Sequence, residues 1–286
     1  MTLIEQLLLG LLLSGAIAYA GYRGKALAPS GALGAMIVGT LIFGFGGWIW
    51  GMVLIAFFIL SSALSFYKKR TKAALAEKFA KGSRRDLGQA LANGGMGALI
   101  ALFYPVIGDP LLFAAFVGAM ATVNADTWAT ELGVLSRLPP RLITNGRHVE
   151  PGTSGGISGL GTLATLMGGL GIGAASALFL RLDGLFGGQG FAHIETEMIR
   201  GTLKLLLVAG LGGLAGAFFD SLLGATAQAI YYSAGRDKET EREIDPDGTP
   251  NQLLRGWAWL NNDWVNFISS GVGAAVAALL WHLAMG

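Results

Sequence analysis

Eight long apolar segments dominate the pattern of hydrophobic and polar positions along the chain. They cover about residues 3–20, 31–47, 49–67, 91–107, 111–130, 155–180, 203–232 and 264–284. A helix needs roughly 20 residues to cross the hydrocarbon core of a bilayer, and most of these segments reach that length. The pattern predicts an all-α fold, a polytopic bundle of about eight transmembrane helices that forms a single integral-membrane domain over residues 1–286.

Two of these segments have unusual lengths or connections. The short segments 31–47 and 49–67 follow one another around Gly46, Gly47 and Trp48, which predicts either a tight hairpin or a re-entrant pair. The segment 203–232 is long enough for its helix to continue beyond the membrane.

Composition supports a membrane protein and limits its chemistry. The chain is 53% hydrophobic and 13% charged, with a mean hydropathy of +0.57, whereas soluble domains carry about 25% charged residues. Its 45 glycines lie largely within apolar runs, where small residues let helices approach closely. The absence of Cys excludes disulfides, iron–sulfur clusters and thiolate zinc sites, and the three dispersed His disfavour zinc or haem. A hard cation held by carboxylates remains open.

Basic residues predict the orientation of the bundle. The connections 21–30, 68–90, 131–154 and 233–263 hold 17 of the 20 Lys and Arg. Cytoplasmic loops carry this excess, so both termini are expected on the non-cytoplasmic side, in the inner (plasma) membrane of a prokaryote. The basic run 68–85 is interpreted mainly as a segment facing lipid headgroups, with phosphate attraction as the alternative, and the charged run 236–247 as a solvated loop.

Acidic residues occur at the cytoplasmic end of the fifth span. Asp126 and Glu131 continue directly from the apolar run 111–123. An ionised acid within a bilayer costs about 2.5–3.5 kcal/mol, so these acids need a cation, a metal-bound phosphate or a proton path. On a regular helix the two acids lie on different faces. If they serve one ion, the helix must therefore end or unwind between them; otherwise they have separate partners.

Four further polar clusters fall at the same end of the predicted bundle. They belong to the spans that begin near 91, 155 and 264 and to the cytoplasmic half of 203–232, and include Asn93, Thr153, Ser154, Ser158, Asp220, Ser221, Asn262, Asp263 and Asn266. The outer loops carry no comparable cluster. This convergence predicts one site at the cytoplasmic boundary, with no expected role in nucleic-acid binding.

The loop 137–158 alternates bases with Gly and hydroxyl side chains before the sixth span. Gly lets backbone amides approach an anion, and a helix N-terminus favours one. Arg141 and Arg147 are predicted to grip phosphate through their forked guanidinium groups. The loop lacks the G-x-x-x-x-G-K-[ST] pattern and is not a Walker P-loop.

Four motifs in this order resemble one integral-membrane family. They are N-A-D-T-W-A-T-E-L-G from 124, R-L-I-T-N-G-R-x-V-x-x-G-T-S-G-G-I-S from 141, F-D-S-L-L-G-A-T-x-Q from 219 and N-D-W-V-N-F-I-S-S from 262. The family is domain of unknown function 92, which includes the phytyl-phosphate kinase of vitamin E synthesis and the animal transmembrane protein 19. The family is also distantly similar to dolichol and phytol kinases and to CDP-diacylglycerol synthase.

The resemblance implies a Mg²⁺-dependent prenyl-phosphate kinase. It would transfer a phosphoryl group from CTP, or another nucleoside triphosphate, to a prenyl monophosphate such as phytyl or geranylgeranyl phosphate. Positioning and charge neutralisation dominate such a reaction. The acids expected to act in catalysis are Asp126, Glu131, Asp220 and Asp263, of which Asp126, Asp220 and Glu131 would hold the metal. Substrate phosphates would be bound or oriented by Asn93, Asn124, Thr127, Arg141, Arg147, Thr153, Ser154, Ser158, Ser221, Asn262 and Asn266.

Two other functions remain open at this stage. Discontinuous helices with polar residues near the midplane would indicate a transporter of a small anion or lipid phosphate, but the polar clusters lie on one side and no convincing repeat is present. A non-catalytic lipid-binding protein would have no use for acids facing a basic Gly-rich loop. Membrane lipids are expected partners, and the sequence leaves a homodimer open.

Overall fold

The computed structural model describes residues 2–67, 84–185 and 201–285. Within this part of the chain, eight helical segments are long and apolar enough to cross a membrane, which confirms the predicted transmembrane bundle. The helices are α1 (Leu3–Arg23), α2 (Pro29–Leu41) with the π-helix η1 (Ile42–Gly46), α3 (Trp48–Phe66), α5 (Leu87–Ile107), α6 (Pro110–Gly133), α7 (Gly159–Leu185), α9 (Thr202–Thr226) and α10 (Asn262–Met285). Most of the predicted loop 68–90, residues 68–83, lies outside the described residues.

Local sequence explains where several helices begin. Asp86 caps α5 through a capping box with Gln89, and Asp109 caps α6 ahead of Pro110, whose fixed φ suits the first helical turn. The chain reverses between η1 and α3 at Gly47, whose φ of 86° is accessible to a residue without Cβ. The two segments around Gly47 therefore form the tight hairpin that was one of the two predicted arrangements.

Helix α6 lies at the centre of the bundle and contacts α3, α5, α7, α9 and α10. Residues 113–125 of α6 are all buried. A Cβ placed on Gly213 of α9 would lie 3.2 Å from both the Ala121 carbonyl oxygen and the Gly169 Cα of α7. Small residues thus bring three backbones into direct contact, as the glycine pattern predicted. Tight packing fixes the end of α6 that carries Asp126.

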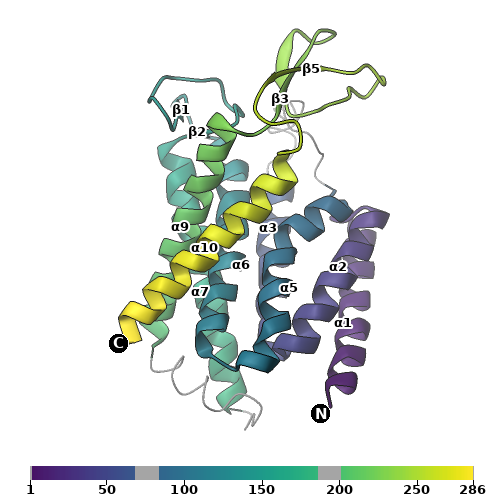
Figure 1. Ribbon diagram of the computed structural model, residues 1–286, viewed down its shortest axis with the longest axis vertical. Coiled ribbons are helices and arrows are strands. Elements are labelled where there is room, and N and C mark those ends of the chain that lie inside the picture. The colour runs from purple at the N-terminus through teal and green to yellow at the C-terminus, as the bar shows by residue number, and fades with distance from the viewer. Residues whose placement is uncertain (1, 68–83, 186–200, 286) are drawn as a thin grey trace.

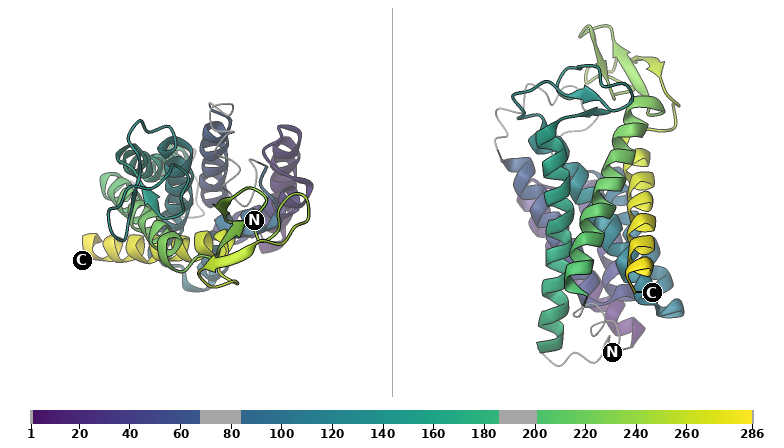
Figure 2. Two further views of the ribbon diagram at one scale, coloured as in Figure 1. Left: turned by 90° about the horizontal axis from the view of Figure 1, so that it is seen from above. Right: turned by 90° about the vertical axis from the view of Figure 1, so that its left-hand side faces the viewer.

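Short strands cover one end of the bundle, and both termini lie at the opposite end (Figure 1; Figure 2, right). Strand β1 (Arg141–Leu142) pairs with β2 (Gly156–Ile157), and a three-stranded sheet has the order β4 (Lys238–Thr240), β3 (Ile230–Ser233), β5 (Gln252–Arg255). The predicted polar ends of the helices lie beneath these strands. That this end faces the cytoplasm stays a prediction.

The sheet corrects two expectations for the region after α9. Helix α9 ends at Thr226, so the predicted helical continuation to 232 is wrong. Residues Ile230–Ser233 instead pair on both edges, in keeping with the preference of Ile and Tyr for strands. The run 236–247 is also not simply a solvated loop, because it contains β4 and the buried Asp245.

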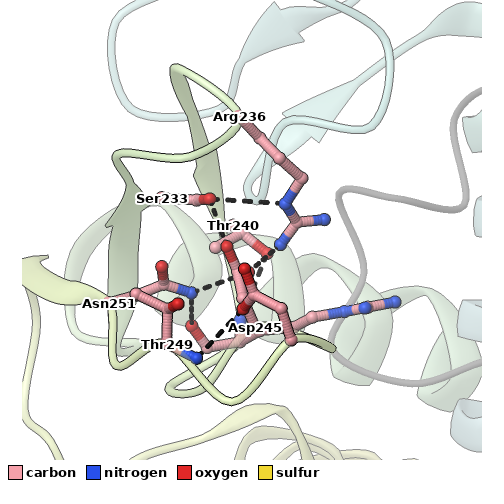
Figure 3. Close-up of polar contacts among 8 residues, drawn as sticks. Ser233, Arg236, Thr240, Asp245, Thr249 and Asn251 are labelled. Atoms are coloured by element: carbon pink, nitrogen blue, oxygen red, sulfur yellow. Dashed lines mark hydrogen bonds and ion pairs between the residues drawn. The ribbon is translucent and has the colours of Figure 1, made fainter.

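A polar cluster around Asp245 holds this region together (Figure 3). The Asp245 carboxylate forms an ion pair with Arg236 and accepts hydrogen bonds from the Ser233 hydroxyl and, at 3.0 Å, from the Asn251 amide. The hydrogen bonds from Asn251 and Ser233, together with Arg236, lower the pKa of Asp245 to about 2. The cluster fixes the chain that follows β4 against the rest of the sheet.

Candidate functional site

A polar cavity of about 450 Å³ lies beneath the strands, where α5, α6, α7, α9 and α10 come together. This volume is typical of small-molecule sites. The predicted residues that line it are Asn93, Asp126, Thr127, Glu131, Thr153, Ser154, Ser158, Asp220, Ser221, Asn262 and Asn266. Residues from all five predicted clusters therefore share one cavity.

Four predicted residues do not line this cavity. Asn124 is fully buried inside the bundle, where it accepts a hydrogen bond from Ser61 at 3.0 Å and donates to the Gly168 carbonyl at 2.8 Å. These bonds tie α6 to α3 and α7, so the Asn124 side chain is used in packing.

The other three predicted residues that do not line the cavity are Arg141, Arg147 and Asp263. Arg141 and Arg147 are exposed, and the Arg141 guanidinium donates to the Gly146 carbonyl within the same loop at 3.0 Å. Asp263 follows Asn262 on α10, and consecutive helical residues point about 100° apart. Asn262 therefore faces the cavity, and Asp263 does not line it.

Three carboxylates from distant parts of the sequence gather in the cavity. Asp126 on α6, Asp220 on α9 and Glu241 after β4 lie close enough to repel one another electrostatically. Oδ2 of Asp220 is buried and accepts no hydrogen bond of ordinary geometry, and the Ser269 hydroxyl lies close to this carboxylate. We refer to Asp126, Asp220 and Glu241 as the acid cluster. Among the described residues, no three His, Asp or Glu side chains are arranged to hold a metal ion by themselves.

Glu131 has a different electrostatic partner from Asp126. Helix α6 continues through both residues to Gly133, and five residues of helix rotate a side chain by about 140°. Glu131 consequently interacts with Arg85, which precedes α5. This contact agrees with separate partners for the two acids, and whether Asp126 and Glu131 serve one ion stays a prediction.

Arg85 is the basic side chain among those that line the cavity. Its guanidinium donates to the Ser62 hydroxyl at 3.0 Å. Burial lowers the pKa of Arg85 to about 10, and the charge of Glu131 opposes this decrease. Arg85 therefore stays cationic at neutral pH and lines the same cavity as the Gly-rich loop, residues 137–158.

The Gly-rich loop is held in place by its own strands and by α9. The β1–β2 pair closes it, and the Ile143 amide donates to the Gly155 carbonyl at 3.0 Å. Gly155 has a φ of 83°, and a Cβ there would lie within 2.6 Å of the Ala225 backbone. Only glycine suits this close approach. Thr153 and Ser154 line the same cavity as the acid cluster.

A chain of hydrogen bonds connects this loop to the acid cluster. The Ser154 hydroxyl donates to the side-chain oxygen Oε1 of Gln228 at 2.8 Å. The side-chain amide nitrogen of Gln228 in turn donates to Glu241 Oε1 at 3.0 Å. The side-chain amide of Asn266 donates to Oδ1 of Asn93 at 3.4 Å, and this hydrogen bond links α10 to α5. Side chains from the loop, the sheet and the helices are therefore interconnected around one space.

Sequence reasoning gave no site role to Arg85, Gln228 or Glu241. Arg85 was grouped with a basic run, and Glu241 with a charged loop. Gln228 ends one of the four motifs, which was the available signal for it. Glu241 had no comparable signal, because it reaches the cavity only after β4 folds back on β3.

Known membrane proteins resemble this chain over most of its length. Residues 12–274 match the family described as Integral membrane protein DUF92. The chain belongs to this family. It is 30% identical to Protein PGR from Arabidopsis thaliana, over 92% of both chains. It is 29% identical to an uncharacterized membrane protein, MJ0933, from Methanocaldococcus jannaschii, over 91% of this chain and 87% of that protein.

The chain is also similar to the chloroplastic Protein VTE6 from Arabidopsis thaliana. Protein VTE6 is 27% identical over 89% of this chain and 65% of its own length. No solved structure matches the chain.

Proposed function

We propose that this DUF92 protein is a Mg²⁺-dependent prenyl-phosphate kinase, which transfers a phosphoryl group from a nucleoside triphosphate, with CTP favoured, to a prenyl monophosphate in the membrane. The observation that carries the proposal is that the acid cluster and the Gly-rich loop line one cavity. Kinship to Protein VTE6, together with the motifs of a family that contains a phytyl-phosphate kinase, supports a place in prenyl-phosphate metabolism.

The acid cluster fits Mg²⁺ as a phosphate-bound ion. Mg²⁺ prefers oxygen ligands and usually takes one or two carboxylates together with substrate phosphates and water. Asp126 and Asp220 would hold the ion, with Glu241 beside them, and the buried Oδ2 of Asp220 offers an oxygen that no protein donor occupies. When bound, Mg²⁺ neutralises phosphate charge.

The side chains around the cavity would orient the two substrates. Thr153 and Ser154 have hydroxyl groups that donate to phosphate oxygens, and the loop amides lie beside them. Asn93 and Asn266, already linked to each other, would fix phosphate oxygens from the other wall. Confinement of both substrates in one pocket supplies the alignment on which phosphoryl transfer depends.

The chemistry needs no strong general base. An oxygen of the lipid monophosphate attacks the terminal phosphorus of the nucleotide, the bond from that phosphorus to the bridging oxygen breaks, and the nucleoside diphosphate leaves. The attacking oxygen is already ionised at neutral pH, so no proton has to be removed. This explains how a cavity with no His in its lining can support the reaction.

The structure gives less support to the two alternatives. A transporter needs a polar route through the membrane, but residues 113–117 and 119–121 of α6 belong to the hydrophobic core of the bundle. A lipid-binding protein without catalysis would gain nothing from crowding three carboxylates together, since like charges destabilise the folded state.

A direct assay tests the proposal. Purified protein in nanodiscs would be incubated with Mg²⁺, labelled CTP, ATP or GTP, and a panel of prenyl alcohols and monophosphates, with the products identified by mass. We expect a prenyl diphosphate and a nucleoside diphosphate in equal amounts. If no nucleotide donates to any acceptor, while protein in liposomes moves phosphate across the bilayer, the kinase proposal is wrong.

A further inference from the structure

A second cavity, apolar and narrower, adjoins the polar one. It has a volume of about 70 Å³ and lies between α1, α2, α3 and the start of α5. Its walls are formed mainly by aliphatic and aromatic side chains, including Ile17, Val38, Leu54, Ile55 and Phe58. We refer to it as the apolar crevice. It shares Arg85, Gln89 and Asn93 with the polar cavity, so the two spaces meet at these three residues.

The helix packing explains why the crevice exists. Helix α2 packs on α1 and α5, whereas α3 packs on α6 and α7 and meets the α2 hairpin mainly through η1. The two helix groups therefore diverge on the side away from η1. Viewed along the bundle, α3 stands apart from α1 (Figure 2, left). The apolar crevice lies between these helices.

Arg85 is held rigidly at the junction of the two cavities. Its amide donates to the Ala26 carbonyl at 3.0 Å, and its carbonyl accepts from the Ala28 amide at 2.9 Å. The approach is so close that a Cβ on Gly31 would lie 1.9 Å from the Arg85 carbonyl oxygen. The guanidinium lies 5.7 Å from the Phe57 ring and 5.8 Å from the Phe58 ring. One side of Arg85 thus faces aromatic walls and the other faces the polar cavity.

We propose that the apolar crevice holds the end of the acceptor lipid's isoprenoid tail that adjoins the phosphate, and that Arg85 binds this phosphate. This assignment rests on the proposed kinase function and adds the location and orientation of the acceptor. The Gly-rich loop and the acid cluster are then left for the nucleotide.

The order of polarity along the two cavities favours this occupant. An apolar space, one fixed cation and a polar space follow one another, as do the tail, the phosphate and the attacking oxygen of a prenyl monophosphate. Arg can bind a phosphate through two parallel hydrogen bonds. Glu131 is the acid facing Arg85, and it contributes to holding the guanidinium at the junction. A prenyl alcohol has no charge to match Arg85.

The tail position can be tested by photo-crosslinking. A prenyl monophosphate with a diazirine in its tail would be bound to the full-length protein in nanodiscs, and labelled peptides would be mapped by mass spectrometry. We expect labelling of residues 35–43 and 54–58, reduced by excess unlabelled geranylgeranyl monophosphate. Competable labelling confined to α7, α9 or α10 would overturn the proposal. This readout does not require turnover.

Matched variants test the crevice independently. Ile55 lines the crevice, whereas Ile59, one turn later on α3, is 58% exposed. We expect Ile55→Trp to raise the KM for geranylgeranyl monophosphate about ten-fold, equivalent to about 1.4 kcal/mol, while Ile59→Trp leaves it unchanged. Equal kinetics for both variants would remove the tail from the crevice without affecting the kinase proposal.

Arg85 has a matched neighbour in Arg84, which is exposed and donates to the Leu27 carbonyl at 3.2 Å. Binding of a fluorescent prenyl monophosphate and of the corresponding alcohol would be measured without nucleotide. We expect Arg85→Gln to weaken monophosphate binding at least ten-fold and alcohol binding little, with Arg84→Gln near wild type. Equal effects of Arg85→Gln on the two ligands would overturn the role of Arg85. If the wild type binds the lipid as expected but makes no diphosphate, the kinase proposal fails and the binding site stands.

Discussion

Gln228 donates a hydrogen bond to Glu241 at 3.0 Å, which joins the end of α9 to the chain that leaves β4. Because Gln228 also accepts from Ser154, one buried amide connects the Gly-rich loop, the helix and the sheet. A side chain in this position fixes the third carboxylate of the acid cluster. Gln228 is therefore interpreted as a positioning residue for Glu241.

Replacement of Gln228 by Glu tests this connection. The variant keeps an acceptor for Ser154 but loses the donor to Glu241 and adds a negative charge beside the acid cluster. Loss of a buried hydrogen bond costs about 1–3 kcal/mol, so we expect kcat/KM for prenyl-diphosphate formation to fall by about ten-fold or more. Rescue at higher Mg²⁺ concentration would identify the added charge as the cause. Gln252→Glu, on the exposed face of β5, is the control. Equal activity of the two variants would contradict the positioning role.

Substitutions in the acid cluster are expected to lower activity more than the substitution of Gln228. Asp126→Asn and Asp220→Asn each remove one negative charge with little change in volume. If these carboxylates hold Mg²⁺, diphosphate formation should fall by at least about 100-fold, equivalent to about 2.7 kcal/mol, while thermal unfolding stays cooperative. Asp109→Asn is the control, because Asp109 caps the opposite end of α6 and Asn is an equally good cap. Wild-type turnover in Asp126→Asn or Asp220→Asn would remove that residue from the metal site.

The bundle and much of the site could be predicted from the sequence because the signals were local. Long apolar segments are sufficient to indicate membrane helices, and polar clusters at alternate helix ends must meet at one side. Asp126, Asp220, Thr153, Ser154, Asn93 and Asn266 were placed together for this reason, and the structure brings them to one cavity.

The remaining contacts depend on tertiary folding. Glu241 reaches the cavity only because β4 pairs with β3, and nothing in the charged run 236–247 shows that pairing in advance. Arg85 belongs to a basic run in the sequence, but its backbone hydrogen bonds to Ala26 and Ala28 are what place it at the cavity. Conversely, Arg141 matched a phosphate-binding pattern, yet the loop turns its side chain towards Gly146.

A comparison of two glycines in the Gly-rich loop distinguishes the effect of backbone strain from the effect of close packing. Gly155 and Gly146 both have positive φ, 83° and 70°, but only Gly155 has neighbours within 4 Å of the position that a Cβ would take. Alanine in a left-handed conformation costs about 1–2 kcal/mol. We expect Gly146→Ala to incur this cost alone, whereas Gly155→Ala also displaces the loop from Ala225 and lowers activity. Thermal unfolding and diphosphate formation would be measured for both. Equal activity losses would show that the contact with Ala225 is unimportant.

The polar cluster around Asp245 predicts how the sheet responds to acid. In the folded state Asn251, Ser233 and Arg236 hold the pKa of Asp245 at about 2, below its ordinary value of 3.8. A lowered pKa means that the carboxylate stabilises the folded sheet fully above about pH 4, and that this contribution is lost as the pH falls through about 2. Hydrogen exchange of residues 230–255, corrected for intrinsic rates, would follow the transition.

Asp245→Asn should make this region less protected at neutral pH and its protection nearly independent of pH between 4 and 2, the interval set by the two pKa values. Because the same region carries Glu241, the variant should also lose kinase activity at neutral pH, with α6 and α9 as protected as in the wild type. Asp247→Asn is the matched control, since Asp247 is exposed and accepts only a local bond from the Thr249 amide. If Asp245→Asn loosens the sheet but transfers phosphate at the wild-type rate, Glu241 is not needed in the acid cluster, and Asp126 and Asp220 alone would serve the metal.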